Sequence, residues 1–393
     1  MKPVIYDYVI GELKARNVQD ADKFGPFYII SYACHAFNLH NKAHRIFTQG
    51  GIVKSMRVPV IHMGPPGCGK TYFLEQMSDK TSGILQKLPY KLKFEQKMTD
   101  AGLVGTVSPN PQDPENPVVK KGVAETHKDS LILIDEFSDL MKESNSSFAV
   151  KNETMLAALD SGRVINAMAN GEYEYETNFT LWCGVQPVKS DMSGGIGRRL
   201  CIILNIPTKE SKLRYKKASR ASDNVRVDES HMNDLTTLLN MWTTTISMIE
   251  HVEFTDAFYD FVECELNADN YIIELYKKMG IGYTIARFGG CKKLVVDLDD
   301  TIKEILTNEH LWRKQVMQGP EIQQILSLIE SYGINSETGS TIQRVTLNLC
   351  GSEMGLSASQ IHKSLMDMKS YGYVTIKNNQ VTMNPIVTKY YEL

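Results

Sequence analysis

The segment "VIHMGPPGCGKTYFLEQM", residues 60–77, matches the spacing G-x-x-x-x-G-K-[ST] at Gly64, Gly69, Lys70 and Thr71. The apolar residues before the first glycine predict a buried strand, and the residues after the threonine predict the start of a helix. In such an arrangement the loop N–H groups turn inward and bind phosphate oxygens at the helix N-terminus. The segment therefore predicts an α/β fold with a nucleotide-binding site.

Each residue type in this loop suits phosphate binding. Lys70 would reach the β- and γ-phosphates, and the Thr71 hydroxyl would bind Mg²⁺. A chance glycine turn is the alternative, which the agreement of four positions and both flanks disfavours. We therefore expect ATP and Mg²⁺ as cofactors. The residues expected to contact the nucleotide are Gly64, Pro65, Pro66, Gly67, Cys68, Gly69, Lys70, Thr71 and Tyr72.

A second apolar run, "LILIDEF" at residues 131–137, ends in two carboxylates. Its four apolar residues predict a buried strand, and open α/β sheets bind ligands at the carboxyl ends of their strands. Asp135 is therefore expected to hold Mg²⁺ through water, and Glu136 to orient or deprotonate the attacking water. The order of the two motifs is a specific signal, because both strands can end at the same edge of the sheet.

Composition limits the class of protein. The chain has 393 residues, which suggests two or three domains, and a net charge of −3, which excludes a globally basic nucleic-acid binder. Its seven cysteines are scattered without a C-x-x-C pair, which argues for free thiols in a reducing compartment. We see no signal peptide and no apolar run near the ~20 residues of a membrane helix. We therefore expect a cytoplasmic protein with no membrane partner.

The first three of four expected regions precede residue 319. Residues 1–50 predict two helices from apolar positions at helical spacing. Residues 51–207 contain "VPVIHM", "LILIDEF", "TLWCGV" and "LCIILNI", which predict buried strands of a parallel sheet with helices on both faces. A proline-rich segment at 105–122 predicts a loop or an insertion. Residues 208–318 are expected to be helical and begin with the basic run "KESKLRYKKASR", most simply a solvated surface.

The fourth region, residues 319–393, predicts a winged-helix domain. "EIQQILSLIESYG" is an amphipathic helix, and Ser357 with Gln360 forms a capping box before a second helix. Two alternating runs around Asn378 and Asn379 predict a hairpin. Winged helices bind DNA or dock other proteins, so the fold alone assigns neither function. The side chains that the second helix would present to solvent are Ser359, Gln360, His362 and Lys363.

Further blocks resemble the AAA+ ATPases, in the branch with a hairpin before the sensor-1 strand, and most closely the motor domain of minichromosome maintenance (MCM) helicases. The resemblance implies an AAA+ core, a helical lid and an appended winged helix. The similar blocks follow family order across residues 58–307 and are "DAGLVGTV" (100–107), "KGVAETHKDSLILIDEFSDL" (121–140), "NETMLAALDSGRVINAMANGEYEYETNFTLWCGVQP" (152–187), "GRRLCIILNIP" (197–207) and "IARFGGCKKLVVDLDDTIKEIL" (285–306).

The resemblance also implies site roles. Gln186 stands where the family has the sensor-1 asparagine, whose amide bonds the γ-phosphate or the lytic water. Arg199, with Arg198 as substitute, corresponds to the arginine finger that completes a neighbour's site, so a homo-hexameric ring is implied. A pair of surface cations beside a turn is the alternative for these arginines. The sensor-2 position falls among three cations, Lys277, Lys278 and Arg287.

The hairpin segment "VINAMANGEYEYE" (164–176) departs from the family. It lacks the basic residue that grips DNA at the tip, and its return arm is acidic. The DNA-encircling N-terminal region of MCM proteins has no counterpart in the roughly 50 residues before the core. DNA contact would therefore rest on local cations. The candidates are Lys120 and Lys121 in the insertion, and Lys363 and Lys369 on the second helix of the winged-helix domain.

Alternative functions remain open. The first is an ATP-hydrolysing ring motor on DNA, an MCM-like helicase or DNA remodeller in replication, for example that of a mobile element or phage. The second is a protein-remodelling ATPase similar to the MoxR group, which shares the hairpin. A nucleotide-gated loader or scaffold, docking protein partners through the winged helix, is the third. The lid and the winged helix favour DNA, whereas the acidic hairpin favours protein.

Overall fold

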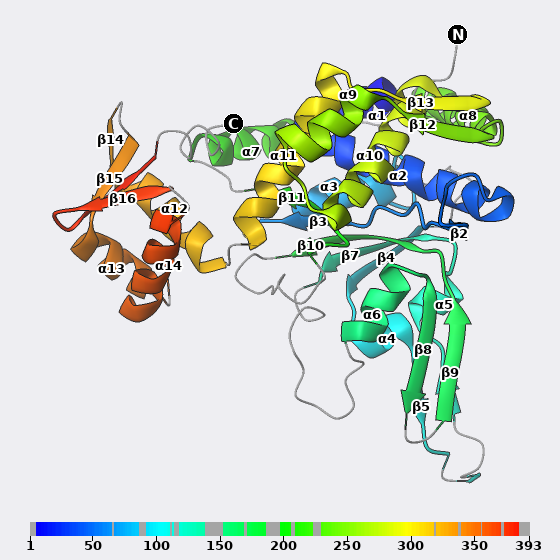
Figure 1. The fold of residues 1–393 in the computed structure, drawn as a ribbon, viewed down its shortest axis with the longest axis horizontal. Coiled ribbons are helices and arrows are strands. Elements are labelled where there is room, and N and C mark those ends of the chain that lie inside the picture. Colours follow the sequence, from blue (N-terminus) through cyan, green and yellow to red (C-terminus); the bar gives the residue numbers. More distant parts are fainter. Residues whose placement is uncertain are drawn as a thin grey trace.

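The computed structural model describes most of the chain (Figure 1). The described residues are 5–64, 67–85, 92–110, 112–113, 118–137, 152–168, 171–185, 197–205, 209–222, 229–317, 320–336, 339–354, 356–370 and 373–384.

A five-stranded parallel sheet forms the centre of the molecule. Its strand order is β11 (Cys201–Leu204), β3 (Val60–Met63), β10 (Thr180–Val185), β7 (Leu131–Glu136) and β4 (Leu92–Lys97). Every side chain of β3, β10 and β11 is buried, as expected of strands covered on both faces. The four strands predicted from apolar runs are thus confirmed.

The edge strand β4 was not predicted from the sequence. It reads "LKFEQK" and pairs in parallel with β7. Lys93 and Glu95 form an ion pair of 2.8 Å on it, and both remain about a third exposed. An edge strand needs no continuous apolar run, which is why its polar sequence gave no signal.

Helices cover one face of the sheet in two layers (Figure 1). α2 (Ala21–His44) packs on the strands, and α10 (Asn270–Phe288) packs on α2; α1 (Tyr6–Ala15) and α3 (Lys70–Ser78) lie on the same side. Trp182 of β10 donates a 2.7 Å hydrogen bond from Nε1 to Ser31 Oγ of α2. Tyr28 of α2 stacks on Phe73 of α3 with ring centroids 4.9 Å apart. The first two helices therefore belong to the central core.

Two hairpins project from the other side of the sheet, beside α4 (Asp100–Val104), α5 (Val123–Thr126) and α6 (Asn152–Leu159) (Figure 1). One joins β5 (Thr106–Ser108) to β6 (Val118–Lys120), and the other joins β8 (Arg163–Met168) to β9 (Gly171–Glu176). The proline-rich segment, residues 105–122, thus contains both strands of the first hairpin.

Residues 209–317 are mainly helical, as predicted, but contain one parallel strand pair. β12 (His251–Phe254) pairs with β13 (Lys293–Val296), and β1 (Thr48–Gln49) with β2 (Ile52–Val53) forms a small separate hairpin. One hydrophobic core runs from Ile5 to Val316. The helical elements here are α7 (Lys209–Ser222), α8 (Glu229–Ile246), α9 (Asp256–Asp260), the π-helix η3 (Phe261–Glu265) and α11 (Asp300–Met317).

The C-terminal region has its own hydrophobic core, from Ile322 to Met383. The capping box is confirmed: Ser357 N–H donates to Gln360 Oε1 at 2.9 Å, and Gln360 N–H donates to Ser357 Oγ at 3.3 Å. The predicted hairpin turn is confirmed by the positive φ of Asn378 and Asn379. The elements are α12 (Pro320–Tyr332), β14 (Ile334–Ser336), β15 (Gly339–Gln343), α13 (Arg344–Glu353), α14 (Ala358–Ser370), β16 (Val374–Lys377) and β17 (Gln380–Met383).

The antiparallel sheet of this region has the order β14-β15-β17-β16. Its β14, β15 and α13 were not predicted. Throughout the described part of the chain, no helix combines the length and the apolarity of a membrane span.

Candidate nucleotide-binding site

The carboxyl ends of four parallel strands meet at one edge of the sheet. Gly64 follows β3 and donates its N–H to Val185 O at the end of β10 (3.1 Å). Asn205 follows β11 and donates its N–H to Met63 O (2.7 Å). Asp135 lies near the end of β7. Parallel pairing alone therefore brings residues from distant parts of the sequence to one edge.

A cavity of about 790 Å³ opens at this edge. Its volume lies within the range usual for small-molecule sites, roughly 300–1,000 Å³. It is lined by Asn17, Val18, Gln19, Phe24, His62, Gly67, Cys68, Gly69, Lys70, Thr71, Tyr72, Phe73, Asp135, Glu136, Val185, Asn205, Tyr215, Lys216 and Ala218. The two sequence motifs thus share one cavity.

The glycines of the loop have conformations that other residues adopt poorly. Gly67 and Gly69 have φ of +77° and +85°. A Cβ atom on Gly64 would lie 2.6 Å from Cys68 Sγ and 2.7 Å from Asn205 O. The loop can therefore fold back tightly before α3 begins at Lys70.

The side chains of Lys70, Thr71 and Asp135 lie around the N-terminus of α3. Lys70 Nζ donates to Gly64 O at 2.6 Å, and Thr71 Oγ1 donates to Asp135 Oδ1 at 2.6 Å. Glu136 lines the same cavity one residue after Asp135. A cation, a hydroxyl and two carboxylates are thus collected where the helix dipole favours anions.

Several residues that line the cavity were not predicted from the sequence. Asn205 donates from Nδ2 to Cys68 O (2.9 Å) and to the Tyr215 hydroxyl (3.1 Å), and this hydroxyl donates to Asp20 Oδ2 (2.7 Å). Asn205 carries the same signal as Asp135, a polar residue directly after a buried strand. Tyr215 belongs to the basic run expected to be a solvated surface. That expectation was wrong for Tyr215, which is half-buried against the loop.

A buried imidazole lies beneath the loop. His62 of β3 bonds the Tyr28 hydroxyl through Nδ1 at 3.0 Å and is 1% exposed. Burial, and then the charge of Lys70, lower the pKa of His62 to about 3. Burial also raises the pKa of the Cys68 thiol. His62 is therefore neutral at physiological pH.

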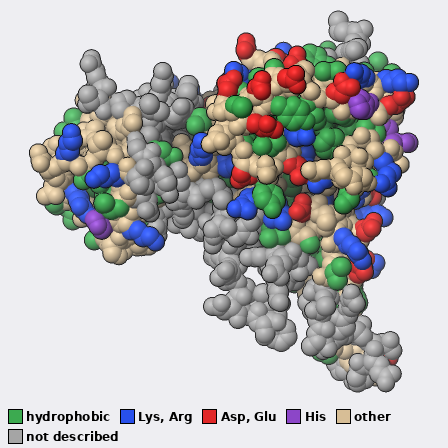
Figure 2. Space-filling model, viewed as in Figure 1, with side chains coloured by type: hydrophobic (Ala, Val, Ile, Leu, Met, Phe, Trp, Pro, Cys, Tyr) green, Lys and Arg blue, Asp and Glu red, His purple; other side chains and the backbone are tan. Residues whose placement is uncertain are grey.

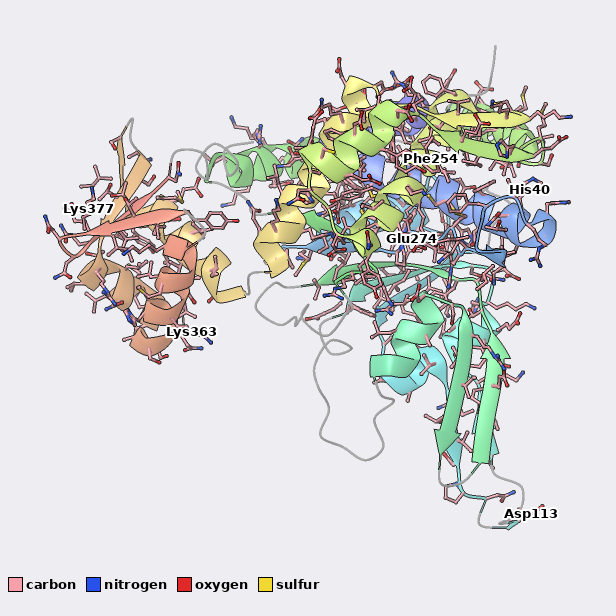
Figure 3. The ribbon with its side chains drawn as sticks, in the orientation of Figure 1. His40, Asp113, Phe254, Glu274, Lys363 and Lys377 are labelled. Atoms are coloured by element: carbon pink, nitrogen blue, oxygen red, sulfur yellow. The ribbon has the colours of Figure 1, made fainter. Side chains whose placement is uncertain are left out.

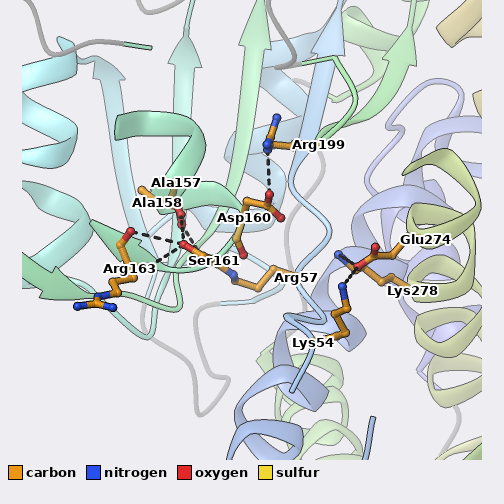
Figure 4. Close-up of polar contacts among 10 residues, drawn as sticks. All are labelled: Lys54, Arg57, Ala157, Ala158, Asp160, Ser161, Arg163, Arg199, Glu274 and Lys278. Atoms are coloured by element: carbon orange, nitrogen blue, oxygen red, sulfur yellow. Dashed lines mark hydrogen bonds and ion pairs between the residues drawn. The ribbon is translucent and has the colours of Figure 1, made fainter. Parts of the chain in front are cut away.

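Three of the predicted contacts, Pro65, Pro66 and Gln186, lie outside the described residues. Arg199 lies within the described residues, just before β11 (Figure 4). Asn205 and the cavity lie at the other end of that strand, so Arg199 is at the opposite edge of the sheet. Four strand residues span ~13 Å, so Arg199 does not reach the cavity of its own chain. The neighbouring Arg198 places its guanidinium over the Tyr271 ring, 5.4 Å from the centroid.

None of the sensor-2 alternatives lines the described part of the cavity. Lys277 lies over the rings of Phe47, Phe254 and Tyr259. Lys278 lies 3.6 Å from Glu274, and Arg287 lies 2.8 Å from Asp7. These cations could therefore contact a nucleotide in the cavity of their own chain only if α10 moved. Otherwise they could contact a nucleotide bound to another subunit.

The DNA candidates lie in two places. Lys120 pairs with Thr106 where the β5–β6 hairpin leaves the core, and Lys121 forms a 2.9 Å ion pair with Glu125. Asp113, not a lysine, lies at the far end of that hairpin (Figure 3). Lys363 and Lys369 are exposed on α14. In Figure 2 blue side chains are spread over the C-terminal region, whereas red side chains gather over the upper part of the core.

Comparison with known proteins adds no relative. No protein-family model matches the sequence, and no curated protein matches it.

Proposed function

We propose that this protein binds and hydrolyses ATP with Mg²⁺ at the cavity formed by the phosphate loop and the end of β7. The observation that carries the proposal is the 2.6 Å contact between Thr71 Oγ1 and Asp135 Oδ1. Two hard oxygen ligands from distant segments meet beside Lys70, which fits the ligand preference of Mg²⁺. Bound there, Mg²⁺ would neutralise charge on the phosphates.

The chain's own residues supply the remaining chemistry. The N–H groups at the start of α3 would hold the phosphate oxygens, and Lys70 would exchange its bond with Gly64 O for the β- and γ-phosphates. Glu136, which lines the same cavity one residue beyond Asp135, would accept a proton from the attacking water. Gln186, expected directly after β10, would orient that water from the next strand.

Paired substitutions test this assignment. Lys70→Ala should abolish ATP binding, because it removes the phosphate-binding cation. Glu136→Gln should keep ATP bound and lower kcat by at least about 10²-fold, because an amide accepts no proton. Glu75→Gln, on an exposed position of α3 away from the cavity lining, is the matched control and should behave as wild type. Near-normal turnover of Glu136→Gln would refute the catalytic role.

The position of Arg199 supports a proposal of ring assembly. It lies at the edge of the sheet opposite the cavity, so its expected role at a phosphoryl group can be performed only for a neighbouring subunit. We therefore propose an AAA+ type homo-hexameric ring. Arg199→Ala should bind ATP and lose hydrolysis, and mixing it with Lys70→Ala subunits should restore some activity. A monomer with full ATPase activity would contradict the ring.

We further propose that the ring acts on DNA, as an MCM-like helicase or remodeller. Two hairpins project side by side from the core (Figure 1). The C-terminal region exposes Lys363, Lys369 and Lys377, and Figure 3 labels the first and the last of these. The test is DNA affinity by fluorescence anisotropy at two salt concentrations, with ATPase assays beside it. Affinity should fall steeply as salt rises, because phosphate contacts release counterions.

The protein-remodelling alternative rests on a specific feature of β9. Glu174 and Glu176 are exposed on this strand, although Arg163 of β8 pairs with Glu174. Negative charge on β9 would repel the phosphates of DNA and would attract basic polypeptide segments. If neither single-stranded nor duplex DNA binds at low salt or stimulates hydrolysis, the DNA proposal fails and protein remodelling replaces it.

A further inference from the structure

A buried guanidinium fixes the turn that follows α6. Arg57 is 3% exposed and donates to the carbonyl oxygens of Ala158 (2.9 Å), Phe179 (2.9 Å) and Asp160 (3.0 Å) (Figure 4). Burial lowers the pKa of Arg57 to about 10, which leaves it charged at neutral pH. Because the guanidinium is a rigid planar fork, these bonds hold the main chain of the turn in one position.

The same turn is closed by a glycine. Gly162 has φ of +74°, and its O accepts from Thr177 N–H at 2.7 Å. A Cβ atom there would lie 2.3 Å from Thr177 O and 3.3 Å from the terminal nitrogen of Arg57. The turn therefore packs closely against the segment that follows β9, and Asp160 projects from a fixed backbone.

The Asp160 carboxylate accepts from Arg199. The distance from Arg199 Nε to Asp160 Oδ2 is 3.2 Å, and the side chains are 32% and 55% exposed. An ion pair this exposed shifts an equilibrium by roughly fivefold or less. It is too weak to withhold Arg199 from a triphosphate, which carries several negative charges. It is sufficient to select among the rotamers of a long side chain.

We propose that Asp160, held in place by Arg57, is a positioning residue that orients Arg199 toward the nucleotide site of the neighbouring subunit. The bond through Nε restricts the rotamers that the Arg199 side chain can adopt. The inference rests on the proposed trans role of Arg199. It adds that the arginine is oriented before the subunits meet, by residues of its own chain.

Steady-state ATPase assays on the full-length protein test this inference. Asp160→Ala should lower kcat about two- to fivefold with KM for ATP unchanged, because ATP binds at the other edge of the sheet. Asp160→Asn should lie between Asp160→Ala and wild type, since its amide oxygen still accepts a hydrogen bond. Glu265→Ala is the matched control: it removes a similarly exposed ion pair, with Lys303 at 3.3 Å, and should leave kcat unchanged.

A double-mutant cycle separates positioning from a structural role. If Asp160 acts only through Arg199, Asp160→Ala should have no further effect on kcat in the Arg199→Ala background. Mixed rings provide a second readout. Lys70→Ala subunits have intact Arg199 and Asp160, so adding them to Asp160→Ala subunits should raise the turnover per intact phosphate loop toward the wild-type value.

The outcomes distinguish this inference from the proposed function. If Arg199→Ala retains wild-type kcat, the trans role itself fails. If Arg199→Ala loses about 10³-fold while Asp160→Ala equals wild type, only the positioning role fails. A higher kcat in Asp160→Ala would overturn the inference, because the ion pair would then restrain the arginine. Equal effects of Asp160→Ala with and without Arg199 would overturn it as well.

Discussion

Gly64 directly follows β3 at a point where no side chain fits. Cys68 Sγ and Asn205 O stand 2.6 and 2.7 Å from the position of a Cβ atom. Asn205 O belongs to the main chain that follows β11 and cannot move independently of the sheet. The close approach of this oxygen explains the glycine, and it makes the loop sensitive to a single methyl group.

Gly64→Ala should therefore displace the loop. We expect a loss of about 1–3 kcal/mol in the free energy of unfolding and a clear loss of ATP affinity. Gly11→Ala is the control, because Gly11 lies inside α1 with no atom within 4 Å of the added Cβ. It should stabilise the protein by roughly 0.5–1 kcal/mol. Thermal unfolding and ATP titration measure both, and unchanged affinity in Gly64→Ala would contradict the steric argument.

At the scale of elements, a buried ion pair joins α11 to β11. Glu309 is fully buried and accepts from Ile202 N–H of β11 (3.0 Å) and from the Tyr276 hydroxyl of α10 (2.8 Å). Arg313, one turn later, pairs with Glu309 and donates to the carbonyl oxygens of Gly197 and Leu200. The residues just before β11, which include Arg199, are therefore held by α11.

Removing one partner of this pair should be costly. Glu309→Ala would leave Arg313 as a buried charge without its carboxylate, and we expect destabilisation of about 3–5 kcal/mol. Glu304→Ala, on an exposed position of the same helix, should change the free energy of unfolding by less than about 0.5 kcal/mol. Urea unfolding followed by circular dichroism measures both variants. A loss below about 1 kcal/mol for Glu309→Ala would show that the pair contributes little.

At the scale of the whole molecule, two buried histidines link stability to pH. Burial, followed by the charge of Arg57, lowers the pKa of His35 to about 4, and His62 has a pKa of about 3. Both values lie below the unfolded value of about 6.5. The unfolded chain therefore binds more protons below pH 6.5, so stability is full above that pH and is lost as pH falls.

Each histidine should contribute a loss of about 1.3 kcal/mol between pH 7.5 and pH 5.5. The double variant His35→Gln and His62→Gln should show a shallower decrease over this interval, by about 2–3 kcal/mol. Urea midpoints of both proteins at pH 7.5, 6.5 and 5.5 provide the measurement. The same slope in the double variant would mean that these imidazoles do not govern the acid sensitivity.

The C-terminal region should be separable from the core, because the two hydrophobic cores share no residue. Deleting residues 319–393 should leave ATP binding and the midpoint of core unfolding nearly unchanged and should weaken DNA capture. Binding and ATPase assays on the shortened chain measure the effects. Loss of ATP binding on deletion would show that the two regions depend on each other.

The sequence by itself determined the buried strands, the glycine-rich loop before α3, the carboxylates at the end of β7 and the capping box before α14. These features depend on neighbours within a few positions, so local periodicity and spacing reveal them. The polar edge strand β4, the β12–β13 pair and strands β14 and β15 left no such signal. Strands β4, β12, β13 and β15 are stabilised by pairing with strands distant in the chain, whereas β14 is a short edge strand that pairs with the adjacent β15.

Only the tertiary structure decided what surrounds the site. Asn205, Tyr215 and the segment 17–19 reach the cavity because parallel pairing and helix packing bring residues more than a hundred positions apart into contact. The contact of Asp160 with Arg199, and the opposite position of Arg199 relative to the phosphate loop, depend on the direction of β11 in the sheet. Pairing direction is a long-range property, and no local pattern in the sequence carries it.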